Sequence, residues 1–208
     1  MRVTELKITE KRPNVAVGIP MLEFIPRSAF YPFLFVAQYL TPRDRIMPIH
    51  RSADPATTRN QIIKDGRERP DDSRVLFLFD SDMQPPNNIV DAFARYNLPF
   101  VSGYCTHKSY PYMPIPAMQV GTTKIHGETI YEYRAITSWE VNSGVRQCDA
   151  VGAAAICVRR DVLEQMKPPY FKFEGGGEDL YFCRKVKAVK TDDWPGGAAL
   201  LRFDEVES

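Results

Sequence analysis

The chain has 208 residues, and its 27 Lys and Arg nearly balance 26 Asp and Glu, giving a formal net charge of +1. A hydrophobic content of 44% is that of a globular protein and excludes disorder for most of the chain. Since neutralising phosphates requires clustered Lys and Arg, and no dense basic block is present, we do not expect nucleic acid as a partner.

The length favours one domain with one site. Residues 1–13 mix charges and contain no apolar core, so they do not resemble a secretory signal. No stretch approaches the ~20 apolar residues that a spanning helix needs, so we expect no transmembrane segment and a cytoplasmic protein. The four cysteines form no CxxC pair, which favours buried free thiols over disulfides or a zinc site.

The first half of the chain alternates short apolar runs with helical patterns. Asp54 is a good N-cap, Pro55 suits a first helical position, and Gly66 ends this helical pattern. The run RVLFLF is the most apolar of the chain and predicts a central buried strand. In chain order we predict strand 14–19, helix 28–40, strand 45–49, helix 54–66, strand 74–79, helix 87–96 and strand 100–104. This alternation predicts an α/β fold with a mostly parallel sheet and helices on both faces.

The second half has a different pattern. Pro and Tyr alternate in residues 107–118, which predicts an ordered loop over a site. Residues 119–124 and 128–134, joined through His126-Gly127, predict an inserted β-hairpin. A strand region at 149–158 and helices at 160–166 and 178–186 follow. We therefore expect one catalytic domain over residues 1–186, followed by a polar tail at 187–208 that is either disordered or supplies a strand.

Two aspartates follow the most apolar strand. Asp80 and Asp82 in the sequence DSD lie where a parallel sheet has its ligand crevice, at the carboxyl ends of the strands. Carboxylate oxygens in an open site suit Mg²⁺ or Mn²⁺, with a nucleotide diphosphate completing the coordination. The alternative is a solvated turn after a strand.

A second acidic pair follows three glycines in the sequence GGGED. Glu178 and Asp179 fall in the first turn of the predicted helix, where the helix dipole favours carboxylates. One interpretation is purely structural. The other is that the glycines allow the backbone to approach a substrate, while one carboxylate accepts a proton from an attacking hydroxyl. Arg59 in the earlier helix is open to two interpretations as well: it is either part of a solvated face or a phosphate ligand.

The order of these motifs resembles glycosyltransferases of the GT-A fold, close to the family-2 type. The resemblance covers about residues 15 to 186. It is carried by VAVGIP (15–20), TTRNQII (57–63), VLFLFDSDMQPP (75–86), VSGY (101–104), DAVGAAAICVRRDVLEQM (149–166), PPYF (168–171) and GEDLYFCRKV (177–186). It implies a three-layer α/β/α sandwich with a mostly parallel central sheet.

The resemblance also implies roles for individual residues. Ile19 and Pro20 would lie against the nucleotide base, and Arg59 and Asn60 would help to hold the nucleotide. Asp80 would face the ribose or sugar and, with Asp82 as the direct ligand, would hold the metal. The acceptor side would be lined by Gly152 and Ala153. Asp179 would be the base of an inverting enzyme, with Glu178 as the competing candidate.

These roles imply a metal-dependent glycosyltransferase, most simply a hexosyltransferase, that uses Mn²⁺ or Mg²⁺. Its donor would be a UDP- or GDP-sugar and its acceptor a carbohydrate or another hydroxyl compound. Many relatives supply a histidine ligand after the last helix, and residues 187–208 contain none. This departure motivates an alternative, a catalytically impaired module that binds carbohydrates or nucleotide sugars.

A DxD phosphatase of the haloacid-dehalogenase type is a further alternative. In those enzymes the pair normally follows the first strand, and Thr or Val commonly comes two residues after the second aspartate. Here the pair follows the third predicted strand, and that position holds Gln84.

Overall fold

A computed structural model gives the fold and describes most of the chain. The described residues are 11–21, 34, 36–47, 50–68, 73–83, 86, 88–106, 111, 113–137, 140, 145–189, 191 and 198–201. Within these ranges, no helix is both long and apolar enough to cross a membrane.

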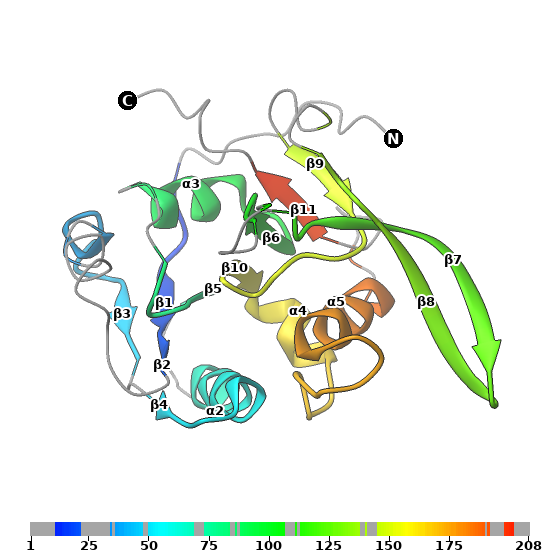
Figure 1. Ribbon diagram of the computed structural model, residues 1–208. Coiled ribbons are helices and arrows are strands. Elements are labelled where there is room, and N and C mark those ends of the chain that lie inside the picture. The colour runs from blue at the N-terminus through cyan, green and yellow to red at the C-terminus, as the bar shows by residue number, and fades with distance from the viewer. Residues whose placement is uncertain are drawn as a thin grey trace.

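A seven-stranded sheet forms the centre of the molecule, in the order β3-β1-β5-β10-β6-β11-β9 (Figure 1). Five of its strands run in one direction, while β9 and β10 run in the other. The strands are β1 (Val15–Gly18), β3 (Arg45–Ile46), β5 (Val75–Phe79), β6 (Phe100–Gly103), β9 (Val145–Cys148), β10 (Ala155–Arg159) and β11 (Ala198–Leu201). The predicted α/β class with a mostly parallel sheet is confirmed at this level.

Four helices and two small sheets complete the described structure. The helices are α2 (Pro55–Glu68), α3 (Ile89–Tyr96), α4 (Arg160–Gln165) and α5 (Glu178–Ala188). One small sheet pairs β2 (Pro20–Met21) with β4 (His50–Arg51), and the other pairs β7 (Ala117–Ile125) with β8 (Glu128–Ala135). These bounds confirm the predicted helices after Asp54, at 87–96, at 160–166 and at 178–186, within a few residues at each end.

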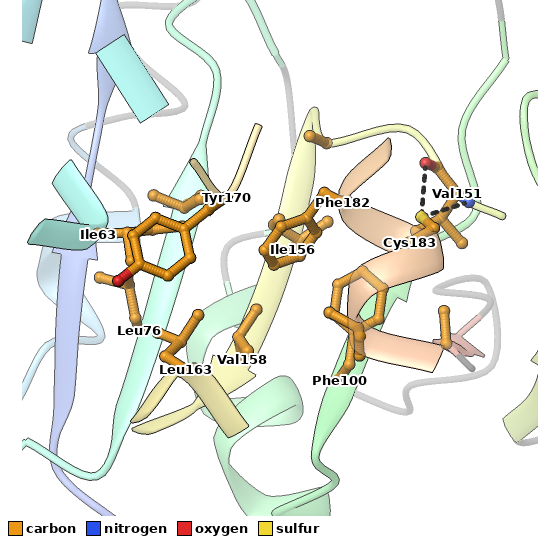
Figure 2. Close-up of a cluster of buried hydrophobic side chains, with 14 of the residues drawn as sticks. Ile63, Leu76, Phe100, Val151, Ile156, Val158, Leu163, Tyr170, Phe182 and Cys183 are labelled. Atoms are coloured by element: carbon orange, nitrogen blue, oxygen red, sulfur yellow. Dashed lines mark hydrogen bonds between the residues drawn. The ribbon is translucent and has the colours of Figure 1, made fainter. Parts of the chain in front are cut away.

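Apolar side chains alternate between the two faces of the sheet. In β5, Phe77 and Phe79 pack with Phe93 of α3 on one face, while Leu76 and Leu78 belong to the cluster on the other face. Figure 2 shows part of this second cluster, where α2, α4 and α5 cover β5, β10 and β6. Burial on both faces explains why β5 is a continuous apolar run.

The β7–β8 hairpin reaches out beyond the helices (Figure 1). His126 and Gly127 form its turn with φ values of 50° and 84°, as a two-residue turn that matches the twist of the strands requires. The predicted hairpin is therefore confirmed, and its first strand starts two residues earlier than predicted. Residues 117 and 118 of the predicted loop belong to that strand, and residues 107–110 and 112 lie outside the described part of the chain.

The prediction of a single strand over 149–158 is wrong. Instead, β10 covers only Ala155–Arg159, and β9 ends at Cys148. Between them Val151 donates its N–H to Cys183 Sγ on α5 at 3.4 Å, the contact drawn in Figure 2. The segment between β9 and β10 is irregular backbone that is buried between the sheet and α5. Its burial, and not strand formation, explains its apolar composition.

Two other predicted segments differ from the structure or lie partly outside it. Strand pairing over 45–49 is limited to Arg45–Ile46 of β3, and residues 48 and 49 lie outside the described part. Most of the predicted helix 28–40 also lies outside it, although residues 34 and 36–38 are helical. The segment 187–208, for which we left two alternatives open, supplies β11 between β6 and β9.

Candidate functional site

Arg59 lies on the buried side of α2. Asp54 caps this helix, because its carboxylate accepts the N–H groups of Ala56 at 3.1 Å and of Thr57 at 2.9 Å. Arg59 falls on the same stripe as the buried Ala56 and Ile63, so the helix directs its side chain inward. Only 6% of that side chain is exposed.

An aromatic stack supports the guanidinium. The ring centroid of Phe171 lies 5.5 Å from Arg59 Cζ. Phe171 is stacked on Phe182 of α5 with a centroid distance of 4.4 Å, and Phe182 meets Phe100 of β6 edge-on at 5.4 Å. The stack thus joins the sheet, α5 and Arg59.

Three carboxylates from two distant segments meet at this guanidinium. Arg59 Nη2 donates to both oxygens of Asp80, at 3.1 and 2.9 Å. Arg59 Nη1 donates to Glu178 Oε1 at 2.9 Å and to Asp179 Oδ1 at 3.2 Å. Although burial by itself lowers the pKa of Arg59, Asp80, Asp179 and Glu178 together raise it, so the group remains a cation.

The end of β5 positions the first acidic pair. The Asp80 N–H donates to the carbonyl of Ala154 at 2.9 Å, and Met83 N–H closes a turn onto the Asp80 carbonyl at 3.2 Å. Asp82 is exposed in this turn. The pair therefore lies at the carboxyl end of the strand, as predicted, with Asp80 turned to Arg59.

A glycine turn positions the second acidic pair. Gly175, Gly176 and Gly177 have φ values of 61°, 107° and 128°, which residues with a side chain rarely adopt. The turn leads directly into α5, so Glu178 and Asp179 occupy its first two positions. Negative charge is favourable there because the helix N-terminus carries a partial positive charge.

Asp179 has a strongly perturbed pKa. Burial raises its pKa to about 6, and the neighbouring charges of Glu178 and Asp80 add to this increase. Arg59 and the N–H of Ala153 act in the opposite direction, since both stabilise the ionised form. A carboxyl group with such a pKa is ionised at neutral pH and still basic enough to accept a proton.

A small hollow opens beside these charges. Its lining includes four predicted site residues, because Pro20, Arg59, Asp80 and Asp82 all contribute to it. The full lining is Pro20, Met21, Ser52, Pro55, Thr58, Arg59, Asp80, Ser81 and Asp82. The lining thus combines apolar side chains with two carboxylates.

The remaining predicted residues have other surroundings. Ile19 is buried beside Pro20. Ala153 is buried too, and its backbone N–H donates to the carboxylate of Asp179. A Cβ atom at Gly152 would lie 3.0 Å from Ile115 and 3.5 Å from Cys105. The absence of a side chain at Gly152 therefore makes room for its protein neighbours.

Asn60 does not join the acidic cluster. Its amide nitrogen donates to the Phe171 carbonyl at 2.8 Å, and its oxygen accepts the N–H groups of Tyr170 at 2.7 Å and Phe171 at 3.0 Å. Asn60 thus holds the backbone that carries the ring beneath Arg59. Its predicted role in nucleotide binding stays a prediction.

Arg59 engages the carboxylates of Asp80, Glu178 and Asp179. In the part of the chain that the structure describes, no group of three or more His, Cys, Asp or Glu side chains is arranged to hold a metal ion. Three carboxylates surround one guanidinium, so their negative charge exceeds its positive charge. Among the histidines, His126 lies in the hairpin turn, and His107 is outside the described residues.

Sequence reasoning missed the central place of Arg59 between the two acidic pairs. One signal was available: an arginine on the same helical stripe as Ala56 and Ile63 is expected to be buried. A buried arginine in turn requires carboxylate partners.

The fold and the site define a mixed α/β protein with an arginine-centred acidic site at the carboxyl end of β5. No family model and no curated protein matches the chain. Among solved structures, the fold is similar to that of A197 from STIV, with a TM-score of 0.56 and 16% sequence identity. The match covers 91% of this chain and 82% of that chain. At this identity, the likeness concerns the fold alone.

Proposed function

We propose that the protein is a metal-dependent glycosyltransferase that moves a sugar from a nucleotide-diphosphate sugar to an acceptor hydroxyl. The observation that carries this proposal is the convergence of Asp80 and Asp179 on one guanidinium. The convergence lies at the carboxyl end of β5, and α/β proteins bind ligands at the carboxyl ends of their strands.

Asp179 is the proposed base. It would accept the proton of the acceptor hydroxyl as that oxygen attacks the sugar. Its pKa of about 6 supports this role, because the group is then ionised at neutral pH and has substantial basicity. Glu178 lies beside it on the same Arg59 nitrogen and is the competing candidate.

Asp80 and Asp82 would hold Mn²⁺ or Mg²⁺, with Asp82 as the direct ligand. When bound, such a cation offsets negative charge on a departing diphosphate. The excess of carboxylates over guanidinium charge supports this assignment, and so does the exposure of Asp82 at the hollow.

The hollow beside the acidic pair is the proposed nucleotide site. Pro20, Met21 and Pro55 give it an apolar side against which a flat base would pack. We expected Arg59 to help to hold the nucleotide. In the structure its N–H groups instead donate to carboxylates. We assign it the role of holding the two acidic pairs together.

The proposal extends to the GT-A type of three-layer sandwich. Support comes from the mostly parallel sheet and from the apolar clusters on both of its faces.

The test combines binding and turnover in matched variants. Thermal shifts with UDP-, GDP-, CMP- and dTDP-sugars, with and without Mn²⁺, identify the donor, since a ligand of the folded state raises the melting temperature. We expect Asp82→Asn to lose the Mn²⁺-dependent shift, and Asp179→Asn to keep that shift but lose transfer. Glu128→Gln at the distant hairpin turn is the control and should change neither.

Three outcomes would contradict the proposal. Normal Mn²⁺-dependent transfer by Asp82→Asn would remove the metal assignment. Donor binding without any transfer across an acceptor panel would favour the binding module. Hydrolysis of an aryl phosphate would instead favour the phosphatase.

A further inference from the structure

Three successive glycines form the turn that leads into α5. Gly175, Gly176 and Gly177 all have positive φ values and no side chains, so the chain loses much conformational freedom when it adopts this path. Glu178 and Asp179 follow immediately. Contacts from outside the turn therefore restrict its path, while Glu178 and Asp179 also bond to Arg59.

Arg184 supplies such contacts from further along α5. Its Nη1 donates to the carbonyl of Gly175 at 3.1 Å, and its Nη2 donates to the carbonyl of Glu174 at 2.8 Å. A Cβ atom at Gly175 would lie 3.0 Å from Arg184 Nη2, so the guanidinium lies directly against the turn. One side chain thus bonds to two successive carbonyls just before the acidic pair.

The hairpin contacts the same guanidinium. Arg184 Cζ lies 4.8 Å from the ring centroid of Tyr131 in β8 and 6.0 Å from that of Tyr181 in α5. A guanidinium over an aromatic face is attracted by the ring electrons, and both groups lose freedom when they meet. Tyr131 therefore limits the movement of Arg184, although most of the hairpin around it is exposed.

We propose that Arg184 is a positioning residue that holds the glycine turn, and with it Glu178 and Asp179, while Tyr131 of the hairpin holds Arg184. The hairpin is then part of the framework of the site and not an independent appendage. The consequence for catalysis rests on the proposed function, whereas the ordering of the turn does not.

Hydrogen exchange of the full-length protein tests the ordering of the turn. In Arg184→Ala, amide exchange in a peptide spanning 174–183 should increase about tenfold, while exchange in the sheet stays unchanged. Arg184→Lys keeps the charge but not the paired donors, so its exchange should be intermediate. Tyr131→Leu should increase exchange in the same peptide by a smaller factor.

Tyr133→Leu is the matched control for the hairpin. Tyr133 lies two residues from Tyr131 in the same strand, and its replacement should leave exchange in the turn unchanged. Unchanged exchange in Arg184→Ala would overturn the proposal. Equal effects of Tyr131→Leu and Tyr133→Leu would overturn the part assigned to the hairpin.

Transfer kinetics add a readout that separates this proposal from the proposed function. With the donor found by thermal shift, Arg184→Ala should lower kcat at least about tenfold and leave the donor KM unchanged, because donor binding involves the other acidic pair. A raised donor KM with unchanged kcat would overturn the positioning role. If the wild-type protein transfers no sugar, the proposed function fails, and the exchange experiment still decides the role of Arg184.

Discussion

Replacing Arg59 with methionine tests whether a buried guanidinium holds the acidic site together. The substitution removes four hydrogen bonds to three carboxylates and leaves those carboxylates facing one another without a cation. Breaking a buried ion pair by removing one partner costs about 3–5 kcal/mol. The carboxylates are 15–31% exposed, so water weakens their repulsion, and we expect a loss of about 3 kcal/mol in the free energy of unfolding.

Urea unfolding at neutral pH and at about pH 5 measures this loss and its origin. Arg59 lowers the pKa of Asp179, so without it the pKa of this carboxyl group in the folded state should rise further above that in the unfolded chain. The folded variant then binds more protons than the unfolded chain in this range, so its stability increases as the pH falls. The difference from the wild type should therefore shrink at the lower pH.

Arg67→Met is the matched control for this experiment. Arg67 lies on the same helix, with its Cζ 5.7 Å from the ring centroid of Tyr170, and donates to the Met166 carbonyl at 3.3 Å and to the Tyr170 hydroxyl. Its loss should cost about 1 kcal/mol at both pH values, since these partners are uncharged acceptors. If Arg59→Met costs no more than this control, or equally much at both pH values, the account of the acidic site is refuted.

Two further predictions concern Asp179 and Asn60. Since Asp179 has a pKa of about 6 and acts only when ionised, kcat/KM for transfer should rise with pH through about 6 and then level off; a profile that falls over this range contradicts its role as base. Asn60→Ala removes three hydrogen bonds to the backbone of residues 170–171, so urea unfolding should show a loss of about 2 kcal/mol, with a smaller loss in Asn60→Asp, which keeps the acceptor. Equal stability of Asn60→Ala and the wild type would contradict the structural role of this amide.

Local sequence patterns predicted the elements whose burial or turn geometry can be recognised from neighbouring residues. The run at β5 is apolar throughout because both faces of a central strand are covered, and the hairpin turn is marked by Gly127. Local patterns failed at 149–154, where an apolar run is buried as irregular backbone against α5. They also left β11 undecided, since four residues in a polar segment become a strand only through pairing with β6 and β9.

The candidate site also combines features that neighbouring residues predict with features that depend on distant contacts. The residue types of DSD and GGGED, together with their places after a strand and before a helix, were enough to predict two acidic pairs at sheet and helix ends. That the pairs share one cation was not predictable, because the contact between Arg59 and Asp179 joins residues 120 positions apart.

The amino-acid sequence alone determined the α/β class, the order of most elements and the chemical nature of the acidic motifs, because each depends on neighbours within a few residues. Only the tertiary structure decided the strand order, the carboxylate partners of Arg59 and the contact between Tyr131 of the hairpin and Arg184. Those features depend on contacts between distant segments, and such contacts form only when the apolar faces of the sheet and helices are buried together.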